Sequence, residues 1–386
     1  MITHAGWADA RRAAFAAASA LPIEVVTVLD CVRRTLARDV RALQDVPHFS
    51  SSAMDGWAVA GEGPWRFDGI SEPMSPRTAT AIVTGGLTPS GATAVVRSEH
   101  GFVEGRELRM LSGCPAPAHG RDIRSPATEA HTGDVLIRAG VKLNPAHAAV
   151  AAGGGHDTVE VVGRGRVAIL TTGAEVVASG IPGPGFVRDS FGPMLPAAIS
   201  GFPGGARVVS HIRLADDRTR LLHTIKAAEA DVIVTTGGTA NSPVDHVRSV
   251  LDELGATFIV NGIEVRPGSP SILARLPDGR FTVALPGNPL AAMMGVLVLL
   301  EPLLAALAGH PLGELDVVVA GEDHEPGKVR LMPYRLVEGT ARASGWRDSS
   351  MLRGLAEADG VMVVEAEGCT VGSVTTVLRM PWVAAV

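Results

Sequence analysis

Three short apolar runs in the middle of the chain each end in a polar, glycine-rich turn. The turns are Thr171-Thr172-Gly173-Ala174-Glu175, Thr235-Thr236-Gly237-Gly238 and Pro286-Gly287-Asn288-Pro289. In an open parallel sheet, ligands bind beyond the carboxyl ends of the strands. Glycines there expose backbone N–H groups, and a helix that follows favours an anion at its N-terminus. One such turn would only close a strand–helix connection, but three at one edge favour a site for an anionic ligand.

A second group of residues could hold an oxyanion. Arg266 precedes Pro267-Gly268-Ser269-Pro270, a turn that two prolines make rigid. Such a turn can direct the Arg266 guanidinium and the Ser269 hydroxyl at one anion, although a surface loop with an incidental arginine would have the same sequence. Asp55 stands before a glycine, and by itself this pattern is more typical of an Asx turn than of a catalytic carboxylate.

The elements that would position these turns alternate regularly. Strand-like runs at 166–170, 206–212, 231–234 and 281–285 are separated by helical patterns at 188–200, 217–229 and 245–253, and a long helix follows 289. This alternation predicts a doubly wound parallel sheet with helices on both faces. The most apolar run, 285–307, contains Pro289, Pro302 and Glu301, which favours a buried helix over a membrane span.

The flanking regions have other patterns. Residues 7–39 show helical spacing of apolar side chains, including Val25, Leu29 and Leu36. Residues 45–125 consist of short apolar runs between Gly, Pro and Ser turns, which predicts a β-rich insert. A helical pattern returns at 145–152. From about residue 313 the runs predict a small C-terminal β domain.

The composition narrows the class of protein. The 386 residues are 46% hydrophobic and 19% charged, typical of a folded chain of several domains. The net charge of −6 includes no basic stripe, which argues against nucleic-acid binding. Cys31, Cys114 and Cys369 are widely spaced, which favours a reducing, cytoplasmic compartment. The alanine-rich segment after Arg11-Arg12 is too weakly apolar for an export signal, so we expect an ordinary helix.

Taken together in order, the motifs resemble those of MoeA proteins and the gephyrin E domain. The matching segments are Leu36–Val40, Asp45–Pro47, Ser52–Val59, Thr84–Val96, Gly120–Ile123, Gly133–Leu136, Thr172–Glu175, Gly237-Gly238 with Asp245, Pro267–Pro270 and Leu285–Pro289. They extend over roughly residues 20–386. Because so many motifs occur in one order, the chain is identified as a member of this family.

The resemblance implies an α/β multidomain fold. Domain I is expected to be discontinuous, helical and extended (1–44 and 126–163), domain II an inserted β-rich domain (45–125), domain III a MogA-like α/β domain that binds molybdopterin (164–310), and domain IV a C-terminal β-barrel (311–386). It also implies a head-to-tail homodimer in which the insert of one subunit faces the α/β pocket of the other. A MogA-like adenylyltransferase is a further expected partner, and neither nucleic acid nor a membrane is expected.

The family reaction takes adenylylated molybdopterin and molybdate, with a divalent cation, usually Mg²⁺, and releases AMP. The resemblance implies that Asp55, Glu175 and Asp245 are catalytic, and that Glu175 and Asp245 hold the metal. The other expected substrate-binding residues are Thr84, Gly85, Asp122, Thr172, Gly173, Asp189, Ser190, Thr236, Gly237, Gly238, Arg266, Pro267, Gly268, Ser269, Pro286, Gly287, Asn288, Pro289, Arg335 and Ser349. Molybdate, a dianion, needs cations and N–H donors, and a pyrophosphate group needs a hard cation.

Several residues depart from the family motifs. Arg266 and Ser269 stand where the family has the two lysines of Lys-Pro-Gly-Lys-Pro, and Ala174 and Phe191 replace an Asp and an Asn. Ala240 and Pro243 likewise depart from the stretch after Gly237-Gly238. The expected function is therefore a molybdopterin molybdotransferase of full or reduced activity. The alternatives are a catalytically impaired relative that binds a pterin or nucleotide or acts as a scaffold, and a hydrolase of another nucleotide-like ligand.

Overall fold

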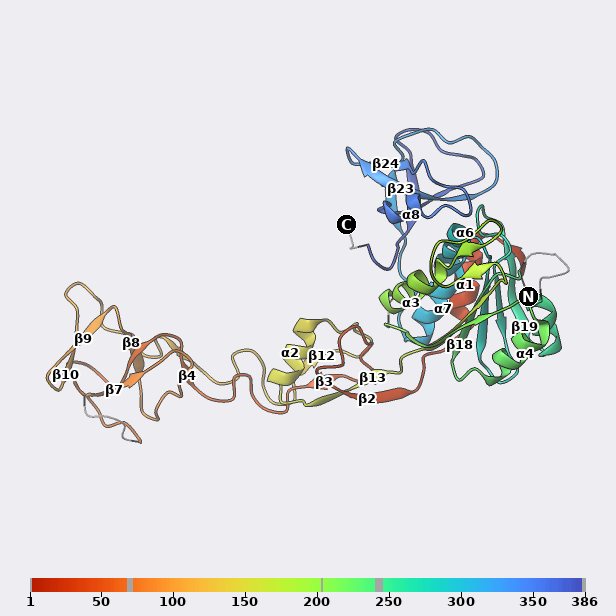
Figure 1. The fold of residues 1–386 in the computed structure, drawn as a ribbon. Helices are drawn as coiled ribbons and strands as arrows, with labels where there is room; N and C mark the ends of the chain where they lie inside the picture. The colour runs from red at the N-terminus through yellow and green to blue at the C-terminus, as the bar shows by residue number, and fades with distance from the viewer. Residues whose placement is uncertain (1, 68–71, 203, 240–245, 384–386) are drawn as a thin grey trace.

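The computed structural model describes residues 2–67, 72–202, 204–239 and 246–383, which form an elongated molecule (Figure 1). An α/β domain and a C-terminal β domain lie together at one end. A narrow stem leads from them to an insert that extends from β4 (Ser51–Ser52) to β11 (Ile123–Arg124). The elements of the stem are β2 (Ile23–Thr27), β3 (Val40–Arg41), β12 (Val135–Ile137), α2 (Pro145–Gly153) and β13 (Thr158–Val162). Asp245, expected to be catalytic and a metal ligand, lies outside the described residues.

The α/β domain is built on a mixed sheet, seven strands of which lie within the described residues. The parallel part comprises β17 (Arg207–Leu214), β14 (Arg166–Thr172), β18 (Val232–Thr236) and β21 (Phe281–Leu285), in this order. Next to β21, β20 (Ile272–Arg275) is antiparallel to it and to β19 (Thr257–Ile263), and β1 (Ile2–Ala5) is parallel to β19. The expectation of a parallel sheet is thus correct for the first four strands. The reversal at β20 follows from the short connection 264–271, because parallel neighbours need a longer crossover.

Helices cover both faces of this sheet. On one face lie α1 (Trp7–Ala16), α3 (Phe191–Gly201) and the continuous helical run of α6 (Pro289–Gly295), η1 (Val296–Leu300) and α7 (Glu301–Leu307). On the other lie α4 (Arg218–Ala227) and α5 (Val247–Glu253). Successive strand residues face opposite sides: Val232 and Val234 belong to the first core and Ile233 to the second.

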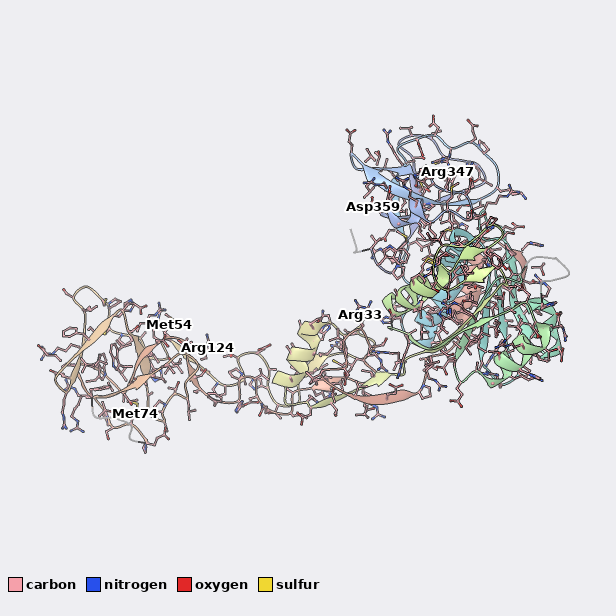
Figure 2. The ribbon with its side chains drawn as sticks, viewed as in Figure 1. Arg33, Met54, Met74, Arg124, Arg347 and Asp359 are labelled. Carbon is pink, nitrogen blue, oxygen red and sulfur yellow. The ribbon has the colours of Figure 1, made fainter. Side chains whose placement is uncertain are left out.

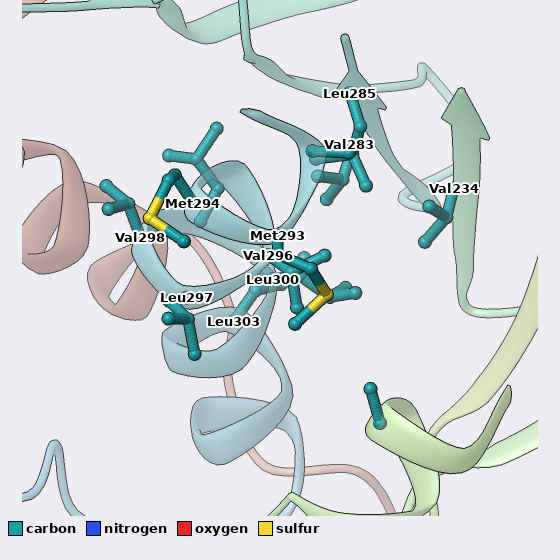
Figure 3. Close-up of a cluster of buried hydrophobic side chains, with 14 of the residues drawn as sticks. Val234, Val283, Leu285, Met293, Met294, Val296, Leu297, Val298, Leu300 and Leu303 are labelled. Atoms are coloured by element: carbon teal, nitrogen blue, oxygen red, sulfur yellow. The ribbon is translucent and has the colours of Figure 1, made fainter. Parts of the chain in front are cut away.

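The run Pro289–Leu307 is the core helix of this domain. Its 19 residues and a mean hydropathy of 2.2 would suit a membrane span, but 94% of its apolar 18-residue window is buried in the fold. Figure 3 shows Met293, Val296 and Leu300 in the cluster that also contains Val234 and Val283 of the sheet. The expectation of a buried helix is confirmed.

The helical expectation for residues 7–39 is wrong beyond residue 16. Residues Ile23–Thr27 form β2, antiparallel to β13 (Thr158–Val162). Val25 is 68% exposed and Leu29 is 88% exposed, so they are not the buried face of a helix. The run Ile23-Glu24-Val25-Val26-Thr27 is mostly β-branched, and pairing with a segment far along the chain decides its conformation.

The N-terminal segment belongs to the α/β domain in space. β1 pairs with β19, and α1 packs against α7. Arg11 of α1 is buried and forms an ion pair of 2.7 Å with Glu301. Residues 1–44 are expected to belong to domain I; within the described residues, β1 and α1 of this segment pack against the α/β domain.

The stem and the insert have small cores of their own. The stem contains β3 (Val40–Arg41), β12 (Val135–Ile137) and α2 (Pro145–Gly153), packed around Leu36 and Val161. In the insert, the described strands form a six-stranded sheet in the order β8 (Ala94–Arg97), β5 (Gly56–Val59), β7 (Thr78–Ile82), β6 (Trp65–Phe67), β10 (Glu107–Met110), β9 (Gly101–Glu104). β4 (Ser51–Ser52) and β11 (Ile123–Arg124) form a separate pair.

The C-terminal β domain closes on itself. Its strands among the described residues follow the order β22 (Asp316–Val319), β26 (Val374–Leu378), β25 (Gly360–Val364), β23 (Arg330–Val337), β24 (Thr340–Ala343), with α8 (Arg353–Ala356) beside β23. A bridge between Ala320 and Ala341 joins the two edges, which makes a barrel. Leu331, Leu355 and Val361 extend the core of the α/β domain, so the barrel is packed onto it.

Candidate functional site

The three glycine-rich turns meet at the carboxyl edge of the parallel strands, which we call the rim. The Thr172 hydroxyl donates to the Thr236 carbonyl at 2.9 Å, and the Gly237 amide donates to the Leu285 carbonyl at 2.9 Å. A Cβ atom on Gly287 would lie 3.6 Å from the Gly237 Cα, and one on Gly237, whose φ is +85°, only 2.8 Å from the Thr172 hydroxyl oxygen. A side chain at Gly237 would crowd the turns, whereas the distance at Gly287 is that of an ordinary contact, so it is glycine at 237 that keeps the rim compact.

Two carboxylates flank the turn that follows β14. The Glu175 carboxylate lies over Gly173, because a Cβ on Gly173 would be 2.9 Å from both of its oxygens. At the same turn, the Asp216 carboxylate accepts a hydrogen bond from the Ala174 amide at 3.1 Å. Asp216 is not among the residues expected from the sequence, although its position two residues after β17 was a usable signal: β17 ends at the same edge of the sheet as β14.

Asp189 is an internal anchor of the rim. Its side chain is 2% exposed; it accepts a hydrogen bond from the Gly192 amide at 2.9 Å and forms an ion pair with Arg213 of β17. Burial alone would raise the pKa of Asp189, but the Gly192 amide and Arg213 outweigh it and lower the pKa. Ser190, directly before α3, is thereby held in place. Asp189 itself has its hydrogen bonds satisfied within the protein.

Where the barrel meets the α/β domain there is a cavity of about 410 Å³, which we call the junction cavity. Its lining residues are Arg266, Pro267, His324, Arg330, Leu331, Met332, Arg347, Asp348 and Ser349. Backbone hydrogen bonds of 2.9 Å, from the Arg266 amide to Val329 and from the Leu331 amide to Arg266, join the 266–270 turn to β23. Figure 2 shows Arg347 on the barrel, next to the α/β domain.

The third rim turn also reaches this cavity. The Asn288 side-chain amide donates to the Ser349 hydroxyl at 3.0 Å, and the Ala291 amide donates to the Ser349 carbonyl at 3.1 Å. The barrel therefore brings Ser349 to the turn 286–289 and to Arg266. Three segments far apart in the sequence thus form one wall.

The junction cavity has a surplus of positive charge. Among the described residues that line it, Arg266, Arg330 and Arg347 face a single acid, Asp348. The His324 side chain is 7% exposed, and its Nε2 has no hydrogen-bond partner within the described part of the chain. Burial lowers the pKa of His324, which favours the neutral ring. Guanidinium groups with few internal partners are well suited to hold an oxyanion.

Arg335 does not line this cavity. It stands five residues after Arg330 on β23, and its guanidinium is 4.0 Å from the Glu357 carboxylate. The bridge between Arg266 and Arg330 brings the start of β23 to the 266–270 turn. A strand advances about 3.3 Å per residue, so Arg335, five residues further along β23, lies well away from Arg266. Arg330 is therefore the barrel arginine that the structure places near Arg266. No local pattern distinguished the two arginines, because only the contact between domains selects one.

The two ends of the 266–270 turn face different cavities. Arg266 lines the junction cavity, whereas Ser269 lines a second cavity with Thr239 and Arg248. Gly268, at φ +113°, lies between them, and a Cβ there would be 3.1 Å from the Ala291 carbonyl of α6. The expectation that Arg266 and Ser269 act on one anion therefore does not fit this geometry.

The expected residues of the insert lie far from the rim of the same chain. Figure 2 shows Met54, which precedes Asp55, at the opposite end of the molecule from Arg347. Asp55 is exposed, and the hydrogen bond of 2.7 Å from the Thr84 amide lowers its pKa. Gly85 follows at φ +79° and is also exposed. Asp55, Thr84 and Gly85 thus form one exposed turn.

Asp122 has a different environment from Asp55. Its two oxygens accept hydrogen bonds from Arg97 at 2.9 and 3.0 Å. The hydrogen bond from Arg97 is the largest cause of the lowered pKa of Asp122. The side chain is 11% exposed, so this ion pair is part of the packed structure of the insert.

The donors near the rim are compatible with a magnesium ion that is shared with a substrate. Within the described ranges, no three His, Cys, Asp or Glu side chains converge on a metal position. Glu175 and Asp216 nevertheless lie at one turn. Mg²⁺ commonly takes one or two carboxylates and completes its shell with water and substrate phosphates. The two carboxylates fit such an ion better than a metal held by protein ligands alone.

Comparison with known proteins gives two family matches along the chain. Residues 6–155 match the MoeA N-terminal region (domain I and II), and residues 168–306 match a probable molybdopterin binding domain. The chain is 30% identical over 373 residues to the molybdopterin molybdenumtransferase of Nostoc sp., covering 88% of this chain and 84% of that protein. It is 28% identical over 320 residues to the enzyme of the same name from Staphylococcus aureus, covering 78% and 74%.

Solved structures share the fold. The crystal structure of the molybdopterin biosynthesis MoeA protein from Pyrococcus horikoshii has a TM-score of 0.77 at 24% identity, covering 97% of this chain and 99% of that one. A molybdenum cofactor biosynthesis protein from Pyrococcus furiosus has a TM-score of 0.60 at 15% identity, with coverage of 97% and 99%. At such identities the likeness concerns the fold alone, and it confirms the expected multidomain α/β architecture.

Proposed function

The chain belongs to the MoeA family of molybdopterin molybdenumtransferases, and we propose that it inserts molybdate into adenylylated molybdopterin with release of AMP. The observation that supports this most directly is the junction cavity, where arginines of two domains meet beside the rim. Molybdate is a tetrahedral dianion, and such a cavity suits it.

In this proposal the junction cavity holds molybdate. Arg266 and Arg330 supply positive charge from the two sides of the domain boundary, and the Ser349 hydroxyl, oriented by Asn288, supplies a further donor. The buried His324 stays neutral and adds no charge to the wall. The Gly287 backbone N–H of the rim binds the anionic end of the pterin substrate, while the Gly237 N–H is already donated to the Leu285 carbonyl.

The carboxylates at the first rim turn hold Mg²⁺ in the same proposal. Glu175 and Asp245 are the expected ligands, and Asp216 is a third candidate because its carboxylate lies at the same turn. When bound, the cation orients the pyrophosphate group and offsets the charge that develops as AMP leaves. The protein's part is to hold these carboxylates in place, and the Arg213–Asp189 pair anchors the neighbouring segment.

We further propose a head-to-tail homodimer in the cytoplasm. Asp55 and Thr84 are exposed at the far end of the elongated molecule, where a second subunit could receive them at its rim. The exposed apolar side chains Val25 and Leu29 of the stem offer surface for such a contact. A MogA-like adenylyltransferase would supply the adenylylated pterin.

The direct test uses purified protein with adenylylated molybdopterin, Mg²⁺ and molybdate, and measures AMP. We expect AMP release that requires molybdate. Tight binding of the pterin without AMP release would contradict the proposal and indicate an impaired relative. AMP release that is independent of molybdate would indicate a hydrolase.

A further inference from the structure

A hydrogen bond between side chains joins the N-terminal helix to the C-terminal barrel. The indole Nε1 of Trp7, in α1, donates to the Glu365 carboxylate at 2.9 Å. Trp7 belongs to the core of the α/β domain, and Glu365 directly follows β25 of the barrel. We call this contact the latch. Neither residue is among the described residues that line the junction cavity, so the proposed function does not yet use it.

The α/β side of the latch is rigid. Trp7 is 7% exposed, and its ring is packed in the same core as α7. One turn further along α1, the buried Arg11 forms its ion pair with Glu301 and donates to the Leu297 carbonyl. These contacts fix α1 to the core helix, so the Trp7 N–H is held at one place relative to the sheet. A buried indole N–H needs a hydrogen-bond partner, and Glu365 supplies it.

The barrel side of the latch lies next to the strand that carries Arg330. β25 pairs with β23, and Val364, the residue before Glu365, is directly opposite Arg330. Ala366, the residue after Glu365, accepts a hydrogen bond of 2.8 Å from the Gly327 amide. Both neighbours of Glu365 are thus paired with the segment 327–330. The latch therefore fixes this segment relative to α1.

The position of Arg330 depends on this segment. The backbone of Arg330 forms the bridge to Arg266, and its Nη2 donates to the Glu325 carbonyl at 2.6 Å. The guanidinium consequently moves with the backbone of 325–330. A binding site needs its donors held within about 0.5 Å of the productive geometry. A contact that fixes this backbone is therefore able to change the affinity of the junction cavity for an oxyanion.

From these contacts we propose that Trp7 is a positioning residue: through Glu365 it fixes Arg330 in the wall of the junction cavity. The inference rests on the proposed function, since that function assigns molybdate to this cavity. Trp7 touches neither molybdate nor the pterin and acts only through the barrel strand. The N-terminal helix in this way contributes to oxyanion affinity from outside the cavity.

The test measures molybdate binding to the full-length protein by calorimetry, without pterin, and the KM and kcat for molybdate in the AMP assay. Trp7→Phe retains an aromatic ring and removes the N–H donor, whereas Glu365→Leu removes the acceptor. We expect each variant to weaken molybdate binding about tenfold, since a displaced guanidinium loses part of a charge-assisted contact. The KM for molybdate should rise by the same factor, and kcat should change less than about twofold.

Two further variants separate positioning from a general loss of structure. Glu365→Gln keeps an acceptor oxygen for the indole, so its molybdate affinity should stay within about threefold of that of the unaltered protein. Glu367→Leu is the matched control for Glu365→Leu, because Glu367 is also exposed and stands two residues further along. It should leave molybdate affinity unchanged. Since Glu365 is exposed, Glu365→Leu should fold and keeps the test decisive if Trp7→Phe does not.

The double variant Trp7→Phe with Glu365→Leu shows whether the two residues act through one contact. Its molybdate affinity should be no lower than that of either single variant, because both remove the same hydrogen bond. Losses that add in the double variant would overturn the proposal. So would a lower unfolding temperature in Trp7→Phe together with unchanged molybdate affinity, which is the result expected of a merely structural residue.

The binding and activity measurements distinguish the latch from the proposed function. Molybdate binding that depends on the latch, in a protein that releases no AMP, would refute the proposed function and leave the positioning role standing. Molybdate-dependent AMP release with the same KM in Trp7→Phe, Glu365→Leu and the unaltered protein would do the reverse.

Discussion

The junction cavity and the insert both contain charged residues of the expected site, but they use them differently. In the junction cavity, three arginines among the described residues share one lining acid, Asp348. In the insert, Asp122 is fully engaged by Arg97, while Asp55 accepts one backbone hydrogen bond and stays exposed. Guanidinium charges that outnumber the acids around them are available to a ligand, although Arg330 also donates to the Glu325 carbonyl at 2.6 Å. A charge paired with an opposite charge of its own domain contributes to the structure of that domain. For a motif residue such as Asp122, the ion pair within the insert explains why an acid stands there, without any contact to a substrate.

The largest expected effect concerns the two arginines of β23. Arg330→Gln should lower molybdate-dependent AMP release about a hundredfold, because loss of one preorganised donor to an oxyanion commonly costs that much. Arg335→Gln, on the same strand but outside the cavity, should change it less than about threefold. Initial rates of AMP formation at saturating pterin provide the comparison. Equal losses in the two variants would show that the cavity does not hold molybdate.

A smaller effect is expected at the rim. Asp216→Ala should lower AMP release about tenfold and raise the Mg²⁺ concentration needed for half-maximal rate, since one carboxylate near the metal is lost. Asp217 is the control: its carboxylate caps α4 through the Arg220 amide at 2.9 Å. Asp217→Asn retains a capping side chain, so it should not alter the Mg²⁺ requirement. If Asp216→Ala leaves that requirement unchanged, Asp216 is not a metal ligand.

The contrast between Asp122 and Asp55 within the insert can be tested by measuring the stability and the activity of variants. Asp122→Ala should lower the free energy of unfolding by about 1–2 kcal/mol, because it leaves Arg97 without its partner in a partly buried position. Asp55→Ala should lower the unfolding temperature less than Asp122→Ala, because it removes one exposed hydrogen bond, and it should lower AMP release in the dimer. Thermal unfolding and AMP assays on both variants distinguish the two roles. A destabilised Asp55→Ala protein with normal activity would reverse our interpretation of that residue.

The smallest effect concerns pH. Asp189 has a lowered pKa in the folded protein, so its pairing stabilises the fold above the unfolded pKa of about 3.9 and is lost as pH falls through the folded value. Between pH 7 and 5 the contribution should be constant. Urea unfolding at a series of pH values below 4 should show a shallower loss of stability in Asp189→Asn than in the unaltered protein. Parallel curves would mean that Asp189 is not coupled to Arg213 as the structure indicates.

Much of the fold was predictable, and so was part of the site. β14, β18 and β21 were predicted from short apolar runs followed by glycine-rich turns. Such runs indicate parallel strands because a strand buried on both faces is apolar throughout and does not alternate apolar with polar residues. The prediction failed at 23–27, where a β-branched run had helical spacing by chance and paired with β13. Asp216 could have been found from its place after β17. No local pattern in the sequence pointed to His324 or Arg347. Nor did any local pattern favour Arg330 over Arg335.

By itself the sequence determined the family, the strand-turn units of the α/β domain and the residue types at the rim, because these depend on local patterns and on motifs in a given order. Only the tertiary structure decided which charges share a cavity. It separated Arg266 from Ser269, and it brought Arg330 and Ser349 to the turns of another domain. The physical reason is that electrostatic interaction depends on distance in space and on burial, and contacts between domains set both.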